Sequence, residues 1–149
     1  MKVIDTNKKA YFDYDILETI EAGISLEGSE VKSVKLGNAR LRDGFCQLSD
    51  GEVWLKNCYI APYEKSNAFA PEPRRNRKLL LHRAEINKLE GKIRQKGLTI
   101  VPTKLYFVRN KVKVEIGLGR GKKLYDKRET AKNKAMQRDA DRAVKEYGR

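Results

Sequence analysis

The sequence has a single histidine, His82, and only two cysteines, Cys46 and Cys58. These residues supply neither the Cys/His spacing of a zinc site nor a disulfide framework, so we expect two free core thiols in a reducing compartment. Nucleophile-elbow, phosphate-loop and dinucleotide-binding motifs are absent as well. The sequence therefore gives catalysis little support, and we expect a protein that is not an enzyme and needs no metal or other cofactor.

Long hydrophobic runs are also missing. No stretch of about 18 apolar residues is available to span a bilayer, and residues 1–10 lack the apolar segment of a signal peptide. An amphipathic membrane helix needs a bulky apolar face, which no segment offers. We therefore expect a cytoplasmic protein with no membrane partner.

Among the charged residues, the acidic ones are in the minority. The chain has 149 residues, with 33 Lys or Arg against 20 Asp or Glu, which gives a formal net charge of +13 at pH 7. Charged residues make up 36% of the chain, above the roughly 25% that is usual for globular proteins. This excess favours a polyanionic partner, because each phosphate contact releases a condensed counterion.

Short alternating segments dominate the first part of the chain. Polar and apolar residues alternate over 11–20, as in a strand with one wet face, and Ala22-Gly23 is expected to break this strand. Asp50-Gly51 predicts a hairpin between two apolar runs. Pro102 interrupts a later apolar run and predicts an edge strand or a bulge. The expected strands are 11–20, 24–26, 45–48, 53–60, 98–101, 105–108 and 112–116.

Two helices are expected between these strands. The shorter covers 29–36 with Ser29 as its cap, and the longer covers 84–96 with Gly97 as its stop. About six short strands with an intervening helix are the count of a small barrel of the OB type. We therefore predict a mainly β fold for residues 1–120, an OB-like closed antiparallel barrel with peripheral helices.

The composition changes after the last predicted strand. Gly117, Gly119 and Gly121 predict a flexible hinge, and segment 121–149 has ten Lys or Arg against five Asp or Glu. Its few large apolar residues do not offset roughly 1–2 kcal/mol per residue of backbone ordering. Its helix propensity is nevertheless good, and no proline follows Pro102. We expect a basic tail that is disordered when free and helical when docked.

Two basic clusters are candidate RNA contacts. Cations bind phosphates and an aromatic ring stacks on an unpaired base, a combination typical of RNA that is not a continuous duplex. The alternative for the tail cluster is a solvated charge run, and for the loop cluster a solubilising loop. The tail cluster comprises Gly121, Lys122, Lys123, Leu124, Tyr125, Asp126, Lys127 and Arg128. The loop cluster, on segment 62–78, which we expect to be a long mobile loop, comprises Arg74, Arg75, Arg77 and Lys78.

Single residues add weaker indications. The carboxylate of Glu21 can accept from the Watson–Crick edge of a guanine, or it is merely solvated. Lys113 is expected to face outward on its strand. Asp13, Asp15 and Glu18 leave open a small metal-dependent nuclease, although Asp13 and Asp15 share the wet face of the predicted strand. A further alternative is a ribosomal or translation-factor-like OB protein that binds ordinary rRNA or tRNA.

The motifs resemble those of one known family. Residues 22–33, AGISLEGSEVKS, closely resemble the signature of the SmpB family, small proteins that bind transfer-messenger RNA (tmRNA). Residues 7–10 resemble the start of that family, 77–82 and 111–114 resemble its later body segments, and 121–128 resembles its tail motif. The resemblance covers essentially the whole chain in order.

This resemblance implies an OB-like barrel with a C-terminal tail that is disordered in solution. The barrel would hold the elbow of the tRNA-like domain of tmRNA and stand in for its missing anticodon arm. On a ribosome stalled at a broken message, the tail would enter the empty message channel, contact small-subunit rRNA at the decoding centre and become helical. The alanyl-charged RNA would then be accepted without a codon, and its reading frame would tag the stalled product. Alanyl-tRNA synthetase and elongation factor Tu are implied as indirect partners through tmRNA.

The resemblance also implies which residues act. Residues that match those implicated in binding the tRNA-like domain are Asn7, Lys8, Glu21, Leu80 and Lys113, and the loop cluster adds Arg77 and Lys78 as expected RNA contacts. Residues that match the tail motif needed at decoding are Gly121, Lys122, Lys123, Asp126, Lys127 and Arg128, with Tyr125 where some members have histidine.

Overall fold

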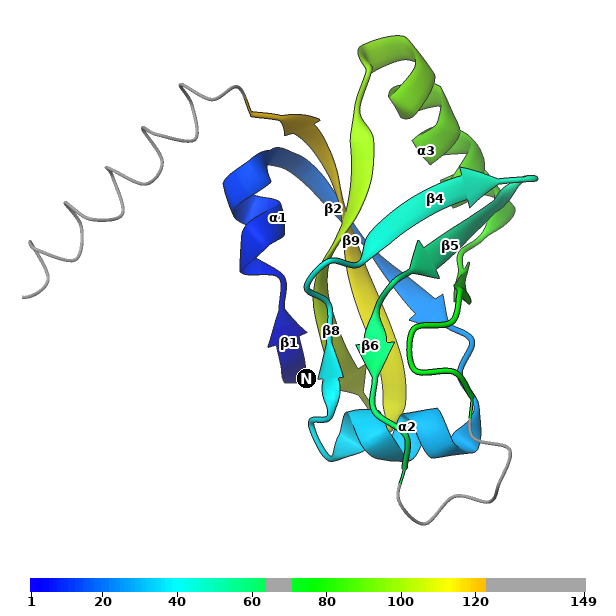
Figure 1. Ribbon diagram of the computed structural model, residues 1–149. Coiled ribbons are helices and arrows are strands. Elements are labelled where there is room, and N and C mark those ends of the chain that lie inside the picture. Colours follow the sequence, from blue (N-terminus) through cyan, green and yellow to red (C-terminus); the bar gives the residue numbers. More distant parts are fainter. Residues whose placement is uncertain (64–70, 123–149) are drawn as a thin grey trace, which may run out of the picture.

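The computed structural model of the chain describes residues 1–63 and 71–122. Antiparallel strands are the main secondary structure of this part, with three helices at the periphery (Figure 1). The tail was expected to be disordered when free and helical when docked. From residue 123 onward, it lies outside the described residues. The elements in chain order are β1 Lys2–Thr6, α1 Lys8–Asp13, β2 Tyr14–Ile24, α2 Gly28–Lys35, β3 Ala39–Arg40, β4 Phe45–Ser49, β5 Glu52–Lys56, β6 Tyr59–Ile60, β7 Arg77–Leu80, α3 Arg83–Lys96, β8 Thr99–Val108 and β9 Lys111–Gly121.

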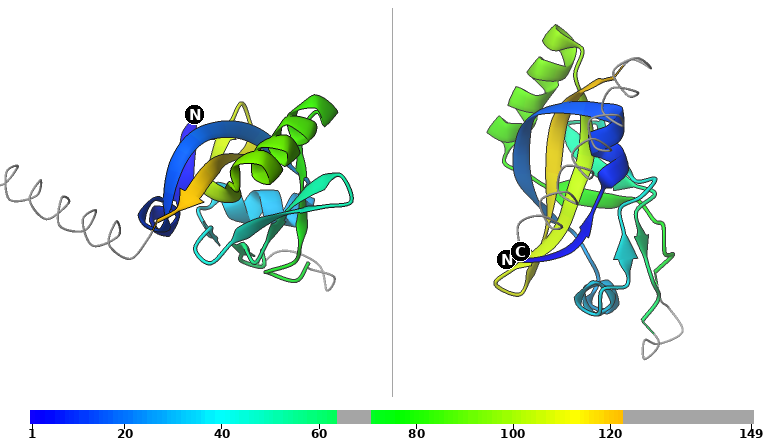
Figure 2. Two further views of the ribbon diagram at one scale, coloured as in Figure 1. Left: turned by 90° about the horizontal axis from the view of Figure 1, so that it is seen from above. Right: turned by 90° about the vertical axis from the view of Figure 1, so that its left-hand side faces the viewer.

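Seven strands form one antiparallel sheet in the order β1-β8-β9-β2-β7-β5-β4, and β3 pairs with β6 in a separate small sheet. The large sheet curls round on itself, as the view from above in Figure 2 shows. The mainly β, OB-like antiparallel fold is thus confirmed, but the expected closure is wrong, because the end strands β1 and β4 do not pair. A side chain bridges part of this opening, since Asp5 Oδ2 in β1 accepts a 2.7 Å hydrogen bond from the Leu41 N–H just after β3.

The core lies on the inner face of the curled sheet. Every second residue of β9 from Val112 to Leu118 is buried, which is the strand periodicity expected from the sequence. α3 contributes Ile86 and Leu89 to the same core. No helix in the described part of the chain is long and apolar enough to cross a membrane. Further buried members of the core include Val34, Leu41, Val53, Leu55, Leu79, Leu105 and Val114.

The first three residues of the predicted strand 11–20 are helical instead. Its residues 11–13 belong to α1, and β2 then runs unbroken through Ala22-Gly23, which pair with β9. A distant contact places this helix, because Asn7 donates from its backbone N–H to the Thr103 carbonyl (2.7 Å) and from Nδ2 to the Pro102 carbonyl (2.9 Å). These partners lie on β8, so no local pattern at residues 11–20 reports them.

The expected glycine hinge is wrong, because Gly117 and Gly119 lie inside β9 and pair with β2. A Cβ on Gly117 would lie 2.9 Å from Ile16 Cγ2, and one on Gly119 would lie 3.0 Å from Tyr14 Cβ. Side chains of β2 therefore pack directly against the β9 backbone, where only glycine leaves room. Glycine in a strand marks either flexibility or close approach, and the sequence does not distinguish the two.

Several local expectations are confirmed. The β4–β5 hairpin turns at Asp50-Gly51, where both residues have a positive φ (52° and 75°). The register of β8 against β9 shifts between Pro102 and Lys104, which is the expected bulge. α3 ends at Gly97 in the left-handed region, with a φ of 63°. These features depend on backbone conformations that few residue types adopt, so the residue type alone indicated them.

Both cysteines are free, as expected. Cys58 is buried, and this burial is the main reason that its thiol pKa rises to about 11. Burial also raises the pKa of Cys46. Neither thiol is thus a thiolate at neutral pH. Cys58 lies in the core as expected, whereas Cys46 is only partly buried against it.

Candidate RNA-binding surface

Three neighbouring strands bring Leu80, Gly23 and Lys113 into one row. Gly23 of β2 pairs with Leu80 of β7 on one side and with Lys113 of β9 on the other. Tyr106 of β8 extends the row, opposite Lys113. Directly paired residues of antiparallel strands point to the same face. Since the next residue of β9, Val114, is fully buried on the inner face, the row lies on the outer face of the sheet.

A hollow of about 530 Å³ opens over this row. It brings together four residues predicted from the sequence to bind RNA, which are Glu21, Lys78, Leu80 and Lys113. The exposed fraction of Leu80 is 52%, so an apolar surface lies in a hollow that is also lined by two lysines and three glutamates: Lys78, Lys113, Glu21, Glu52 and Glu85. Such a surface supports a base or sugar, while cations bind phosphate and the carboxylate accepts from base or ribose donors.

The carboxylate of Glu21 is held by a residue that sequence reasoning missed. The Tyr106 hydroxyl donates to Glu21 Oε2 over 2.7 Å, and only 4% of Tyr106 is exposed. Burial, with this hydrogen bond in second place, raises the pKa of Tyr106. In the sequence Tyr106 is one residue of the apolar run 105–108, and nothing in that run marks its hydroxyl as a partner of Glu21.

His82 lines the same hollow, as Lys78 does. Lys78 Nζ lies 3.6 Å from Glu52 Oε1 across β7 and β5, an ion pair that is partly exposed. His82 is the N-cap of α3, and its backbone N–H donates to Glu85 Oε1 over 2.9 Å. The sequence indicated His82 only as a lone histidine, whereas the fold places it beside the predicted site.

Asn7 and Lys8 lie apart from this hollow, at the junction of β1 and α1. They line a second hollow of about 440 Å³, in which Lys9, Arg40 and Arg42 add positive charge. Asn7 is nearly buried and its amide is used inside the fold, whereas Lys8 is exposed. Arg40 and Arg42 flank the fully buried Leu41. This basic–apolar–basic alternation indicates two outward-facing cations, a signal that the sequence analysis did not use.

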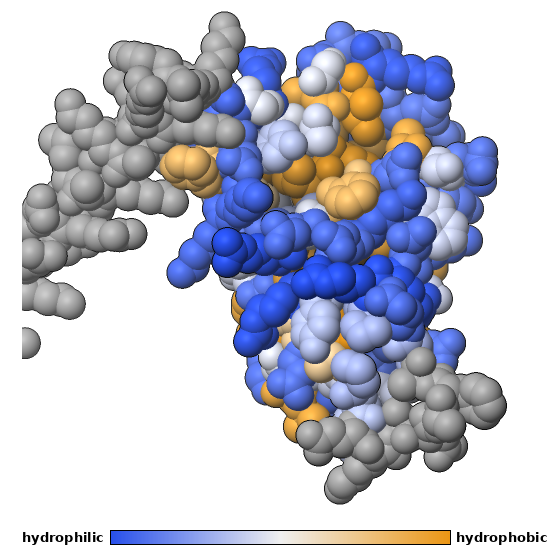
Figure 3. All heavy atoms as spheres, viewed as in Figure 1, coloured by the Kyte–Doolittle hydropathy of each residue, from blue (hydrophilic) through white to orange (hydrophobic). Residues whose placement is uncertain are grey.

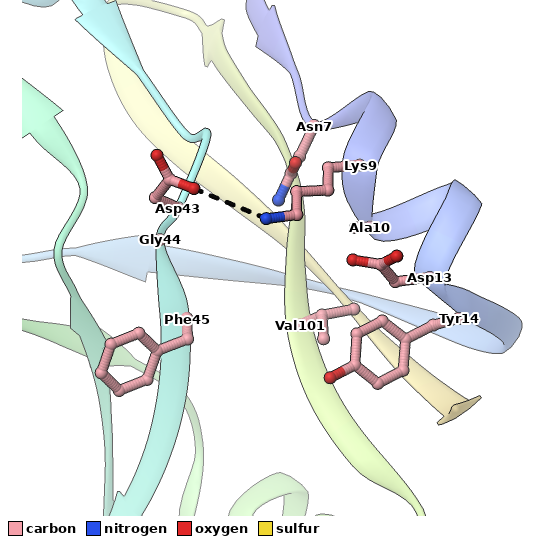
Figure 4. Close-up of a pocket in the computed structure, with 9 residues that line it drawn as sticks. All are labelled: Asn7, Lys9, Ala10, Asp13, Tyr14, Asp43, Gly44, Phe45 and Val101. Atoms are coloured by element: carbon pink, nitrogen blue, oxygen red, sulfur yellow. Dashed lines mark ion pairs between the residues drawn. The ribbon is translucent and has the colours of Figure 1, made fainter. Parts of the chain in front are cut away.

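A third hollow, of about 240 Å³, adjoins the second on the open side of the barrel, between α1 and β4 (Figure 4). The ion pair of Lys9 Nζ with Asp43 Oδ1, at 3.7 Å, spans its rim. Tyr14, Val101 and the half-exposed Phe45 contribute apolar lining. Figure 3 shows apolar atoms in this region of a largely hydrophilic face.

One member of the loop cluster, Arg77, serves the fold rather than a free RNA-binding surface. Arg77 is fully buried, and its guanidinium binds Glu30 Oε2 (2.6 Å) and donates to the carbonyls of Cys58 (2.7 Å) and Pro73 (3.0 Å). The prediction that Arg77 contacts RNA is therefore wrong for its side chain in this structure, because every direction of the guanidinium points into protein. Local sequence could not distinguish it from the exposed arginines beside it.

Glu30 is the centre of this buried network, with 4% of it exposed. It accepts from Arg75 as well as Arg77, at 2.5 Å from Arg75 NH2 to Oε1, and its Oε1 also accepts from the Glu27 backbone N–H at 3.0 Å. Glu27 is the N-cap of α2, so the expected cap at Ser29 is wrong, and this last bond is one half of the capping box that begins the helix. Burial raises the pKa of Glu30, but the bonds from Arg75, Glu27 and Arg77 outweigh burial and bring the pKa below its ordinary value.

The predicted decoding-tail residues are described only at their start. Gly121 closes β9 opposite Tyr14, and the backbone N–H of Lys122 donates to the Asp13 carbonyl over 2.9 Å. Lys122 Nζ donates to the Tyr11 carbonyl over 3.1 Å. The other predicted tail residues lie outside the described part of the chain: Lys123, Tyr125, Asp126, Lys127 and Arg128.

The carboxylates that left a nuclease open do not form a metal-binding group. Glu18 is paired with Lys92 of α3, and this hydrogen bond lowers the pKa of Glu18. Asp13 ends α1, whereas Asp15 is exposed on β2. Within 1–63 and 71–122, no three His, Cys, Asp or Glu residues are grouped so that they could hold a metal ion.

Comparison with known proteins places the chain in a family. A family model described as "SmpB protein" matches residues 4–146. The chain belongs to the SmpB family. The SsrA-binding protein of Synechocystis sp. is 57% identical over 146 residues, which cover 97% of this chain and 95% of that protein. The SsrA-binding protein of Caldicellulosiruptor bescii is 54% identical over 147 residues, which cover 99% of this chain and 93% of that protein.

A solved structure agrees with this assignment. One chain of the structure described as "tmRNA-SmpB: a journey to the center of the bacterial ribosome" is 53% identical to this one, with a TM-score of 0.65. The match covers 80% of this chain and 84% of that one. The resemblance of residues 22–33 and the other motifs to the SmpB family is thereby confirmed.

Proposed function

We propose that this protein binds tmRNA and acts in trans-translation, the rescue of stalled ribosomes in the cytoplasm. The observation that carries the proposal is similarity over nearly the whole chain to relatives named SsrA-binding proteins, together with the match to an SmpB chain from a tmRNA–ribosome structure. The net charge of +13 supports a nucleic-acid partner independently.

The hollow over Gly23, Leu80 and Lys113 on the outer face of the sheet, here called the outer-face hollow, is the proposed binding site for the tRNA-like domain of tmRNA. Lys113 and Lys78 neutralise phosphates, the exposed Leu80 supports a sugar or base, and Glu21 accepts a hydrogen bond from the RNA. Lys8, in the second hollow beside Asn7, adds a further cation. In this arrangement the folded body, residues 1–120, occupies the place of the anticodon arm that tmRNA lacks.

The tail, residues 121–149, is proposed to act at a later step. Its first residues, Gly121 to Arg128, would meet small-subunit rRNA at the decoding centre, and the remainder would become helical in the empty message channel. Ten Lys or Arg against five Asp or Glu in this segment suit a path lined by RNA. Alanyl-tRNA synthetase and elongation factor Tu would be met only through the bound tmRNA.

The proposal is tested by the RNA that the full-length protein retains on purification from cells. One dominant structured RNA with the sequence of tmRNA supports it. Mixed tRNA or rRNA would favour the alternative of a ribosomal or translation-factor-like OB protein. Divalent-metal-dependent RNA cleavage that is lost in Asp13→Asn would instead favour the nuclease.

The proposed grip is tested by a gel-shift titration with tmRNA at moderate salt. Lys113→Ala is expected to weaken binding by about tenfold, because it removes a cation beside the apolar support. Lys88→Ala removes the same charge from the exposed side of α3 and serves as the matched control. Equal binding by both variants would reject the site while leaving the identity of the RNA untouched.

A further inference from the structure

Two carboxylates face each other on the outer face of the sheet. Glu21 of β2 pairs in register with Glu115 of β9. Like charges directly opposite each other on antiparallel strands repel, so both side chains would otherwise turn away from each other into solvent. Neither is left to do so, because each carboxylate accepts a hydrogen bond from a hydroxyl on β8.

The two hydroxyl groups come from buried residues. Thr103, which is fully buried, donates to Glu115 Oε2 over 2.8 Å. Tyr106, 4% exposed, donates to Glu21 Oε2 over 2.7 Å. The Thr103 hydroxyl also lies 3.0 Å from the Glu115 carbonyl, whereas the Tyr106 hydroxyl has Glu21 as its acceptor. A buried phenol with a fixed ring restricts the rotamers of the side chain that accepts from it. Glu21 is the one of these two carboxylates that lines the hollow with Leu80 and Lys113.

We propose that Tyr106 is a positioning residue for RNA binding, whose hydroxyl holds one oxygen of Glu21 so that the other faces the hollow. This inference rests on the proposed function. Tyr106 itself is too buried to offer its ring to RNA, so it acts through Glu21. Because the Glu21 side chain is already ordered in the free protein, RNA binding does not have to bear the entropic cost of immobilising it.

The test is a double-mutant cycle of tmRNA affinity, measured by gel shift with the full-length protein. Tyr106→Phe removes the hydroxyl and keeps the ring. In the wild-type background it is expected to weaken binding by about fivefold to tenfold, because the side chain of Glu21 would then be ordered only when RNA binds. In the Glu21→Ala background the same change should have no further effect. Tyr59→Phe, which removes a hydroxyl from β6, is the matched control.

A purely structural tyrosine would give a different pattern. Tyr106→Phe would then lower the midpoint of thermal unfolding but leave affinity at 25 °C unchanged, or it would weaken binding equally in both backgrounds. Either result overturns the inference. If Glu21→Ala alone leaves affinity unchanged, Tyr106 has nothing to act through and the inference is again wrong, although the protein still binds tmRNA. Failure of the wild-type protein to bind tmRNA would instead reject the proposed function itself.

Discussion

The Cβ that Gly23 lacks would lie 3.2 Å from the Cβ of Leu80. Leu80 therefore packs over the β2 backbone at the one position of that strand that has no side chain, and both residues line the outer-face hollow. The exposed fraction of Leu80 is 52%. The glycine shapes the candidate site, although it offers no chemistry of its own.

Replacing Gly23 with alanine should accordingly affect binding more than stability. The added methyl group displaces Leu80 by a few tenths of an ångström, and tmRNA affinity in a gel shift should fall by roughly threefold to tenfold. The free energy of unfolding in urea should change by less than about 1.5 kcal/mol. Gly28→Ala is the control, since nothing lies within 4 Å of its added Cβ. Unchanged affinity for Gly23→Ala would show that the position of Leu80 does not matter to the RNA.

The buried network predicts where the fold is most sensitive. Glu30→Gln removes the negative charge that compensates the fully buried Arg77, and we expect a loss of about 3 kcal/mol in the free energy of unfolding, measured in urea. Glu90→Gln breaks the exposed pair with Arg94 of α3 and should change stability by less than about 0.5 kcal/mol. Similar effects of the two substitutions would show that the network contributes no more than a surface pair.

The same carboxylate predicts an acid dependence. The folded-state pKa of Glu30 lies below its ordinary value of 4.5, so the unfolded chain takes up this proton first as the pH falls. Its contribution is therefore complete above that ordinary value and is lost below it, as the pH falls through the folded-state pKa. Unfolding free energies measured between pH 7 and about pH 3 should drop less steeply for Glu30→Gln than for the wild type. Parallel curves would assign the acid sensitivity to other groups.

Much of the fold could be predicted because its signals are local. Asp50-Gly51 and Gly97 occupy backbone conformations that few residues adopt, and the apolar alternation of β9 reports its buried face. The helix α1 could not be predicted in this way, since Asn7 is held by carbonyls on β8. Closure of the barrel likewise could not be predicted. It depends on whether the two edge strands pair, and the number of strands does not determine this.

In the candidate site, too, some residues could be predicted from the sequence and others depend on contacts that are distant in sequence. Glu21, Leu80 and Lys113 were indicated by their resemblance to family residues, and the strand register brings them together. Tyr106 was missed because a tyrosine in an apolar run is ordinary, and Arg77 was misjudged because it lies in a basic run. Their roles depend on partners far away in the sequence, Glu21 and Glu30.

The glycines of β9 allow a test of packing against hinge motion. Gly117→Ala places a methyl group 2.9 Å from Ile16 Cγ2 and 3.2 Å from Thr103 Cγ2, so it should destabilise the protein by about 1–3 kcal/mol. Gly121→Ala meets nothing within 4 Å and should change stability by less than about 0.5 kcal/mol. Equal and negligible effects in urea denaturation would restore the hinge interpretation.

The strongest test of the tail is a truncation placed by the structure. A chain cut after Lys122 keeps the strand pairing of Gly121 and the two bonds of Lys122 to carbonyls of α1, so its fold should be retained. At moderate salt it should bind tmRNA within about threefold of the full chain, because salt screens the loss of tail cations. Peptide tagging on stalled ribosomes should be abolished, because the message channel stays empty.

A chain cut after Arg120 is the informative comparison, since it also loses those anchoring contacts at the end of β9. It should unfold at lower urea concentration than the chain cut after Lys122, while both lack tagging. Loss of tagging with intact tmRNA binding separates the tail from the grip on the RNA. Normal tagging by the chain cut after Lys122 would show that residues 123–149 are dispensable. Recognition of the decoding centre would then have to come from the folded body. The basic hollow lined by Lys8 and Arg42 is the surface to test in that case.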